Sequence, residues 1–124
     1  MPSARSELGA RGEGLARAFL KAKGYRVLAT NYRCRFGEVD IIARDGLCLV
    51  FVEVRTRRTR GRFWTPQESI SRRKKERLIA TAETYIQDSD ETQEDWRIDV
   101  VAVNIDSRGI VRPVEHLENA VERS

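Results

Sequence analysis

Two acidic residues interrupt one of the most apolar stretches of the sequence. Asp40 and Glu53 lie among the valine, isoleucine, leucine and phenylalanine residues of the segment 37–55. Burying a carboxylate is costly unless the carboxylate is paired with a cation or bound to a metal. Two such residues in one short segment therefore indicate a site. The chemistry that suits them best is the binding of a divalent cation.

The same segment is predicted to form a β-hairpin that turns at Asp45–Gly46. This dipeptide readily supplies the two positive φ angles of a type I′ turn. A symmetric two-residue turn at this point pairs Arg44 with Leu47. The pairing then continues along one wholly apolar face, with Ile41 opposite Val50 and Val39 opposite Val52.

The other face of the predicted hairpin carries the acids. Asp40 falls opposite Phe51, and Glu38 falls opposite Glu53. Strand residues two apart share a face, so Arg55 lies beside Glu53. Asp40 and Glu53 are then diagonal neighbours, roughly 7–8 Å apart at the backbone. Both carboxylates could reach one cation across that span; alternatively, each pairs with a nearby arginine at the solvated end of the sheet.

The chain as a whole has the composition of a single globular domain spanning residues 1–124. Its 40% hydrophobic and 34% charged residues are ordinary for such a domain. The net charge of +4 and the pI of about 9.4 favour a polyanionic partner such as nucleic acid. No apolar stretch has the length of a signal peptide or a membrane span. We therefore expect a cytoplasmic protein with no membrane partner.

Hydrophobic periodicity and turn residues predict an α/β fold with the element order αβββαββ. Such an order is typical of a sandwich built around a mixed sheet. The predicted elements are a flexible tail at 1–6, a helix at 7–23, a strand at 25–29 that continues extended to 35, the hairpin, a basic loop at 56–66, a helix from Ser69 or Ser71 to Gln87, a strand at 96–103 and a last strand at 110–115.

A run of cations follows the hairpin and forms the second signal in the sequence. It is followed by two aromatic residues, Phe63 and Trp64, and by the basic start of the second helix, residues 72–75. Arginines with neighbouring aromatics suit a nucleic-acid backbone and an unstacked base. The alternative is a solvated loop that Phe63 and Trp64 anchor to the core. The run consists of Arg55, Arg57, Arg58, Arg60 and Arg62.

Two further residues are placed to join a site at the hairpin. Glu13 lies at the margin of the apolar face of the first helix, in line with Ala16 and Leu20, so it could reach the sheet as a third acid. Lys74 precedes Leu78 by four residues on the second helix and points toward its inward face. Each could instead be a solvated helix residue.

Five segments stand out in combination: Gly12-Glu13, Gly37–Asp40, Phe51–Arg55, Arg97–Val103 and His116–Ala120. Together they resemble the YraN-like family of small bacterial proteins, over about residues 9–121. That family resembles Holliday-junction resolvases and the wider PD-(D/E)xK nucleases. The resemblance implies a restriction-endonuclease-like, three-layer fold with a central mixed sheet between helices. It also implies a metal site for Mg²⁺ or Mn²⁺ at Asp40 and Glu53, with Glu13 as a further acid.

The activity that this resemblance implies is metal-assisted hydrolysis of a phosphodiester in structured DNA. Nucleases of that superfamily carry a lysine two residues after the second acid, where this chain has Arg55. Arginine supplies a bidentate charge for phosphate but stays protonated, so it cannot act as a general base. Either Arg55 performs the electrostatic part of the reaction, with Lys74 as a substitute cation, or the site has kept binding without efficient cleavage.

Three functional hypotheses follow from these observations. The first is a Mg²⁺-dependent endonuclease in which Arg57, Arg58, Arg60, Arg62 and Lys74 hold the nucleic-acid backbone. The second is a non-catalytic nucleic-acid-binding module on the same fold. The third is a protein-interaction adaptor that uses Phe63 and Trp64. A homodimer would suit the two-fold symmetry of a four-way junction.

Overall fold

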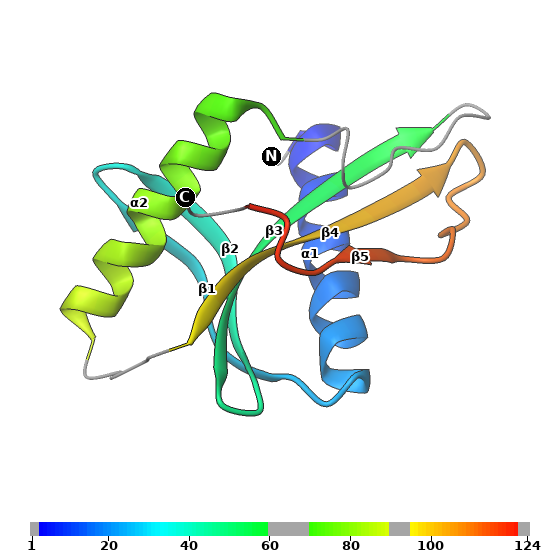
Figure 1. Ribbon diagram of the computed structural model, residues 1–124. Coiled ribbons are helices and arrows are strands. Elements are labelled where there is room, and N and C mark those ends of the chain that lie inside the picture. Colours follow the sequence, from blue (N-terminus) through cyan, green and yellow to red (C-terminus); the bar gives the residue numbers. More distant parts are fainter. Residues whose placement is uncertain (1–2, 60–69, 90–94, 122–124) are drawn as a thin grey trace.

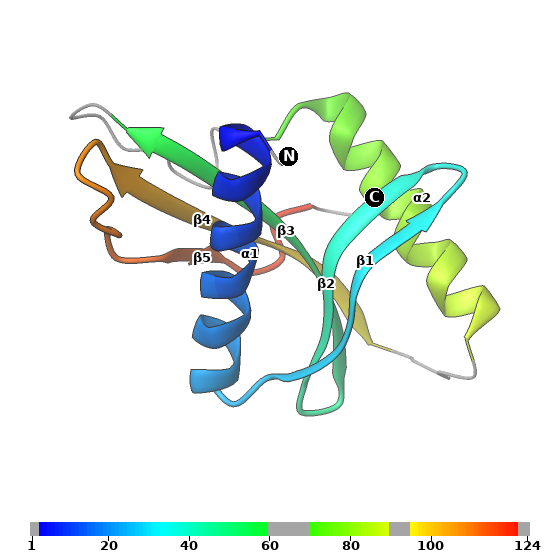
Figure 2. The same cartoon turned by 180° about the vertical axis from the view of Figure 1, so that it is seen from behind.

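One mixed β-sheet separates the two helices of the protein. The computed structural model describes residues 3–59, 70–89 and 95–121. The five strands follow the order β1-β2-β3-β4-β5, with β3 and β4 parallel and the other neighbours antiparallel. Figures 1 and 2 show α1 and α2 on opposite faces of this sheet. The elements are α1 (Ala4–Ala22), β1 (Arg26–Cys34), β2 (Gly37–Asp45), β3 (Cys48–Thr59), α2 (Arg72–Asp88), β4 (Trp96–Asp106) and β5 (Glu115–Leu117).

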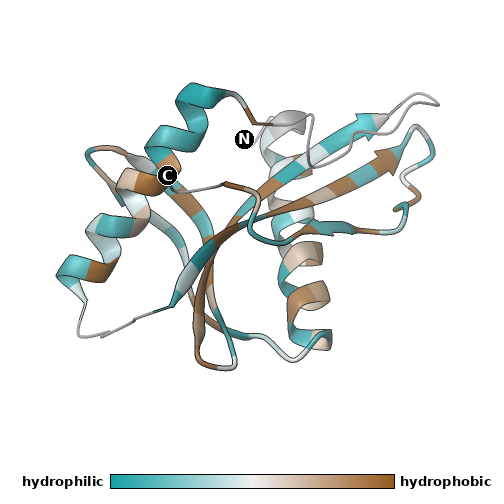
Figure 3. Cartoon of the chain, in the orientation of Figure 1, coloured by the Kyte–Doolittle hydropathy of each residue, from teal (hydrophilic) through white to brown (hydrophobic). Residues whose placement is uncertain are grey.

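The predicted element order and the α/β sandwich are confirmed. Each helix packs on one face of the sheet and forms a separate hydrophobic core with it. Both helices begin at a serine cap: Ser3 accepts a hydrogen bond from the Ser6 amide, and Ser71 accepts one from the Lys74 amide. Figure 3 shows apolar residues along β3 and β4 through the middle of the molecule, where both faces are covered. The α1-side core includes Ala16, Leu20, Ile41, Val50, Val52 and Val101, and the α2-side core includes Val39, Ile42, Phe51, Leu78, Ala82 and Ile98. In the described part of the chain, neither helix is long and apolar enough to cross a membrane.

Three predicted boundaries are wrong, and each has a local cause. Residues 4–6 belong to α1 and not to a flexible tail, because the Ser3 cap starts the helix there. Residues 56–59 belong to β3 and not to a basic loop, because parallel pairing with β4 continues to Thr59 opposite Asp106. The last strand is β5 at 115–117; from the predicted 110–115 strand, only Val111 forms an isolated bridge, with Ile105.

The hairpin between β2 and β3 turns one residue later than predicted. Asp45 pairs with Cys48, so the turn residues are Gly46 and Leu47. Only Gly46 has a positive φ, of 60°, which is the pattern of a type II′ turn and suits leucine in the second position. The predicted partners are therefore wrong by two residues: Ile41 faces Val52 and Ile42 faces Phe51.

The strand β2 changes face at Asp40. Val39 packs in the α2-side core, whereas Ile41 packs in the α1-side core, so these two residues do not share a face as predicted. The neighbouring strand β1 is irregular beside Asp40, because Asn31 has a positive φ of 53°. The β2–β3 ladder ends just beyond, at the pair Ile41–Val52. From that point the two strands diverge, as Figures 1 and 2 show.

A glycine sets the close approach of α1 to β3. A Cβ at Gly12 would lie 2.7 Å from the Cβ of Thr56, well inside contact distance. A Cβ at Gly9, one turn earlier, would meet nothing within 4 Å. Gly12 therefore lets the helix pack where Glu13, the next residue, can face the end of the β2–β3 ladder.

We expect Gly12→Ala to lower the free energy of unfolding by about 1–3 kcal/mol, because an added methyl group overpacks the contact with Thr56. Gly9→Ala is the matched control and should raise it by up to about 1 kcal/mol, since alanine is the better helix former. Urea unfolding followed by circular dichroism measures both. Equal effects of the two substitutions would show that helix propensity, and not close packing, governs position 12.

Candidate functional site

The two predicted carboxylates meet where β2 and β3 stop pairing. The Val54 amide donates to Oδ2 of Asp40 at 2.7 Å, so a side chain takes over where the backbone ladder has ended. Asp40 is also hydrogen-bonded to Glu53, which is only 3% exposed. The structure thus brings the two acids together. They meet because the two strands diverge at this point, and not as diagonal neighbours of a continuous ladder, as predicted.

Burial and charge hold a proton on this pair. Burial raises the pKa of Asp40 to about 8, and the negative charge of Glu53 and the hydrogen bond with Glu53 add to the effect. The hydrogen bond from the Val54 amide opposes the rise but does not cancel it. Near neutral pH the two carboxyl groups therefore keep one proton between them. A divalent cation could take the place of that proton, since it relieves the same repulsion.

Two cations contact Glu53 from different elements. Nζ of Lys74, on α2, lies 2.7 Å from Oε2 of Glu53, so this lysine does point inward. Nη1 of Arg55, two residues along β3, lies 3.8 Å from the same oxygen. The closer and better-placed cation is thus the helix lysine. Arg55, two residues after the second acid, supplies a charge that lies farther from Glu53.

Glu13 faces the pair from α1. Its Oε1 is buried and has no hydrogen-bond partner among the described residues. Burial raises the pKa of Glu13; Arg17 opposes this, whereas the negative charges of Glu38 and Glu53 reinforce it. The described ranges contain no group of three or more His, Cys, Asp or Glu side chains that could hold a metal. The closely placed ligands are therefore a pair, and the role of Glu13 as a third acid stays a prediction.

An open cavity connects these acids with the basic end of β3. It has a volume of about 530 Å³, and Glu13, Asp40, Arg55, Arg57 and Arg58 line it. The side chains of Arg57 and Arg58 are exposed. The cavity thus places arginine side chains and carboxylates along one wall. The predicted contacts Arg60 and Arg62, and the aromatics Phe63 and Trp64, lie outside the described residues.

A two-carboxylate site fits Mg²⁺ or Mn²⁺ as the donor set. These hard cations prefer oxygen ligands, and Mg²⁺ usually keeps several waters and uses only one or two carboxylates together with substrate phosphates. Asp40 and Glu53 supply two carboxylates on rigid strands. The unpartnered Oε1 of Glu13 adds negative charge nearby.

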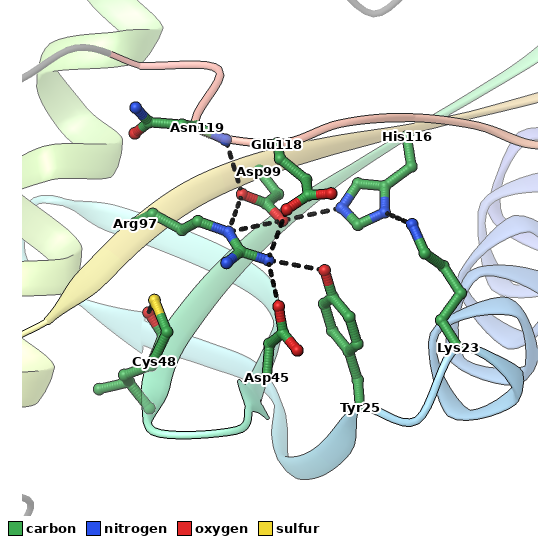
Figure 4. Close-up of polar contacts among 10 residues, drawn as sticks. Lys23, Tyr25, Asp45, Cys48, Arg97, Asp99, His116, Glu118 and Asn119 are labelled. Atoms are coloured by element: carbon green, nitrogen blue, oxygen red, sulfur yellow. Dashed lines mark hydrogen bonds and ion pairs between the residues drawn. The ribbon is translucent and has the colours of Figure 1, made fainter.

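A second buried acid, Asp99, lies in a different cluster, outside the predicted site residues. Asp99 has no exposed surface, and its carboxylate accepts hydrogen bonds from Nε of Arg97 at 3.0 Å and from the Asn119 amide at 2.9 Å. Figure 4 shows Arg97 reaching from Asp99 to the hydroxyl of Tyr25 and to Asp45. Asp99 interrupts an apolar run from Ile98 to Val103, as Asp40 interrupts its own run. The same rule could therefore have found it.

His116 extends this cluster and is held in one tautomer. Its Nε2 lies 2.7 Å from Oδ2 of Asp99, and its Nδ1 lies 2.8 Å from Nζ of Lys23 (Figure 4). A protonated lysine can only donate, so Nδ1 accepts and the Nε2–H donates to Asp99. Every group of the cluster has a partner, and the cluster joins β4 to β5 and to α1. It is a structural ion network.

The fold and the site define a class: small three-layer α/β proteins with a pair of adjoining acids at a strand divergence. The profile described as uncharacterised protein family UPF0102 matches residues 12–103. The chain belongs to this family, which confirms the predicted YraN-like resemblance.

Relatives of the same description cover the chain almost completely. A UPF0102 protein of Pelotomaculum thermopropionicum is 46% identical over 120 residues, which span 97% of this chain and 99% of that protein. One of Roseiflexus castenholzii is 44% identical over 125 residues and spans both chains fully. One of Geobacter sulfurreducens is 44% identical over 115 residues, spanning 93% of this chain and 88% of that protein.

The raised pKa of Asp40 predicts a stability that falls as pH rises. The folded protein binds a proton that the unfolded chain has released, so without divalent cations stability should decline between about pH 4 and pH 8. One unit of pKa difference corresponds to about 1.4 kcal/mol. Asp40→Asn should become more stable than wild type above pH 8. Thermal unfolding in EDTA from pH 5 to pH 9 tests this; parallel curves for the two proteins would refute the shared proton.

The Asp99 network predicts the opposite pH dependence, a stability that falls as the pH is lowered. Burial alone would raise the pKa of Asp99, but hydrogen bonds from His116, Arg97 and the Asn119 amide outweigh it and lower the pKa. Asp99→Asn should cost about 3–5 kcal/mol near pH 7, because it leaves Arg97 without its buried partner, and the loss should shrink on acidification. Glu76→Gln, which breaks an exposed pair with Arg72, is the control and should cost under about 1 kcal/mol. Chemical denaturation at pH 4 and pH 7 measures both.

Proposed function

We propose that this protein is a metal-dependent endonuclease that acts on structured DNA. The observation that carries the proposal is the pair formed by half-buried Asp40 and buried Glu53, which shares a proton beside an arginine-lined cavity. Placing two acids side by side with little exposure is costly unless a proton or a cation compensates their charge. Strongly perturbed carboxyl groups at the edge of a cavity are a frequent mark of a functional site. The arginines of the cavity favour a phosphate-bearing substrate.

Each residue has a distinct part in this proposal. Asp40 and Glu53 supply the oxygen ligands, and the strands β2 and β3 hold them rigidly. A divalent cation held by these two residues would supply Lewis-acid chemistry, lowering the pKa of a coordinated water and offsetting charge on the scissile phosphate. Arg55, Arg57 and Arg58 bind and orient the phosphate backbone along the end of β3.

Lys74 is the group best placed to assist the water. Its Nζ is 2.7 Å from Glu53, whereas the guanidinium of Arg55 is 3.8 Å away. An ammonium group is compact and carries three donors that can orient a water, whereas the planar guanidinium suits bidentate contact with a phosphate. We assign the role of the superfamily lysine to Lys74, with Arg55 as a fixed charge for the phosphate.

One observation favours a second function, a non-catalytic nucleic-acid-binding module. The 2.7 Å contact of Lys74 with Glu53 already gives one acid a counter-ion without any metal. In that case Asp40 keeps its proton, the pair is structural, and the arginines of β3 alone provide affinity. The two functions differ in whether a divalent cation is needed to form product.

A cleavage panel distinguishes them. Labelled single strand, duplex, flap and four-way junction are incubated with Mg²⁺, Mn²⁺ or EDTA. We expect wild type to form product only with a divalent cation. Asp40→Asn and Glu53→Gln should abolish cleavage, and Lys74→Met should slow it by about 10–100-fold. Glu83→Gln, an exposed control, should cleave as wild type does.

Gel retardation of the same DNA panel provides the second readout. Retention of DNA by wild type without product under either metal would support the binding module and reject the nuclease. Product that persists in Asp40→Asn and Glu53→Gln would show that the acid pair is not the catalytic site.

A further inference from the structure

A second groove lies between the β1–β2 turn and α2. Its volume is about 680 Å³. Lys74, which contacts Glu53, also lines this groove, and Arg77 and Leu78 continue its wall along α2. Lys74 therefore links the wall of this groove to the acid pair. The groove lies on the α2 side of the carboxyl pair, away from the cavity at the end of β3.

The lining of this groove is strongly cationic. Arg33, Arg35, Lys74 and Arg77 face it, against a single carboxylate, Glu38. Glu38 is already paired with Arg33 at 2.7 Å. Among the residues that the structure describes, no carboxylate forms an ion pair with Arg35 or Arg77. This excess of positive charge is complementary to a phosphate backbone.

An exposed aromatic side chain projects from the turn that borders the groove. Phe36 is 40% exposed and is the one aromatic among the large apolar side chains exposed in the described residues. The guanidinium carbon of Arg35 lies 4.7 Å from the centre of its ring. An aromatic ring beside an arginine offers a stacking surface for a base together with a charge for its phosphate.

The turn is held in place before any ligand arrives. The ladder between β1 and β2 continues to the pair Cys34–Gly37, so Arg35 and Phe36 are the two residues of a tight turn. The Cys34 thiol is hydrogen-bonded to the Thr81 hydroxyl at 3.8 Å, which ties the turn to α2. A fixed aromatic loses little entropy on stacking, which favours binding.

We propose that this groove binds an unpaired nucleotide, with Phe36 stacked on its base and Arg35 and Arg77 on the adjoining phosphates. This inference rests on the proposed function and specifies its substrate class: DNA with unpaired bases, such as a bulge, flap or junction. An uninterrupted duplex has no free base faces to offer along its length. Its affinity should therefore depend on the arginines and not on Phe36.

The first test measures affinity in EDTA, where no product forms, for a duplex and for the same duplex interrupted by a bulge of unpaired thymines. Phe36→Ala should weaken binding of the bulged DNA by about tenfold and of the plain duplex by less than about twofold. The matched control is Leu47→Ala, since Leu47 is the exposed apolar residue of the other hairpin turn. Equal losses for Phe36→Ala and Leu47→Ala, or no loss of bulge preference, would overturn the inference.

The charged residues are tested by salt dependence. Arg35→Ala with Arg77→Ala should weaken both DNAs and reduce the slope of log affinity against log salt by about 1.8, if each arginine neutralises one phosphate. Arg26→Ala, an exposed arginine at the start of β1, should leave the slope unchanged. An unchanged slope in the double variant would show that no phosphate lies in the groove.

Cys34 provides an internal reporter of occupancy. In a Cys48→Ser background, bulged DNA at ten times its Kd should slow alkylation of Cys34 by about tenfold, since the occupied groove shields the thiol. Protection by an acidic peptide but not by DNA would assign the groove to a protein partner and reject the inference.

These readouts separate the inference from the proposed function. Bulge-specific binding that depends on Phe36, without cleavage under any metal, would support the groove and reject the nuclease. Metal-dependent cleavage of bulged and plain DNA that Phe36→Ala leaves unchanged would support the nuclease and reject the groove.

Discussion

The site depends on one structural event, the separation of β2 from β3 beyond the pair Ile41–Val52. While two strands remain paired, their backbone groups satisfy each other, and side chains in the interior can be apolar. Where they part, the Val54 amide needs another acceptor, and Asp40 supplies it at 2.7 Å. The change of face at Asp40 directs that carboxyl group toward Glu53 and the cavity. The acid pair is thus both the end of the sheet ladder and the start of the candidate site.

The protein stabilises its two inward-facing aspartates, Asp99 and Asp40, in different ways. Asp99 is surrounded by Arg97, His116 and a backbone amide, which lower its pKa and keep it charged. Asp40 has another acid as its neighbour, so its pKa rises to about 8 and it keeps a proton. The first arrangement joins strands and a helix, and it is complete by itself. The second is complete only with a proton or a cation, which is why we place the function there and not at the network of Figure 4.

The sequence predicted the element order, both helices and the meeting of Asp40 with Glu53, because periodicity and the cost of buried charge are local signals. It did not predict the hairpin register, because either Asp45–Gly46 or Gly46–Leu47 could serve as the two-residue turn. The first needs a positive φ at both residues, and the second needs it only at Gly46. The change of face at Asp40 also had no local signal, because it coincides with an irregularity at Asn31 on another strand. The Asp99 network joins residues from Lys23 to Asn119, a separation that no short motif reveals.

The most direct test of this account is a titration of Mn²⁺ into the protein by calorimetry at pH 7, in two buffers with different heats of ionisation. The difference between the two heats gives the number of protons released on binding. Since the pKa of Asp40 is about 8, a cation that binds Asp40 and Glu53 must displace close to one proton, and Asp40→Asn must release none. Binding without proton release, or equal release in Asp40→Asn, would contradict the claim that this acid pair is a metal site.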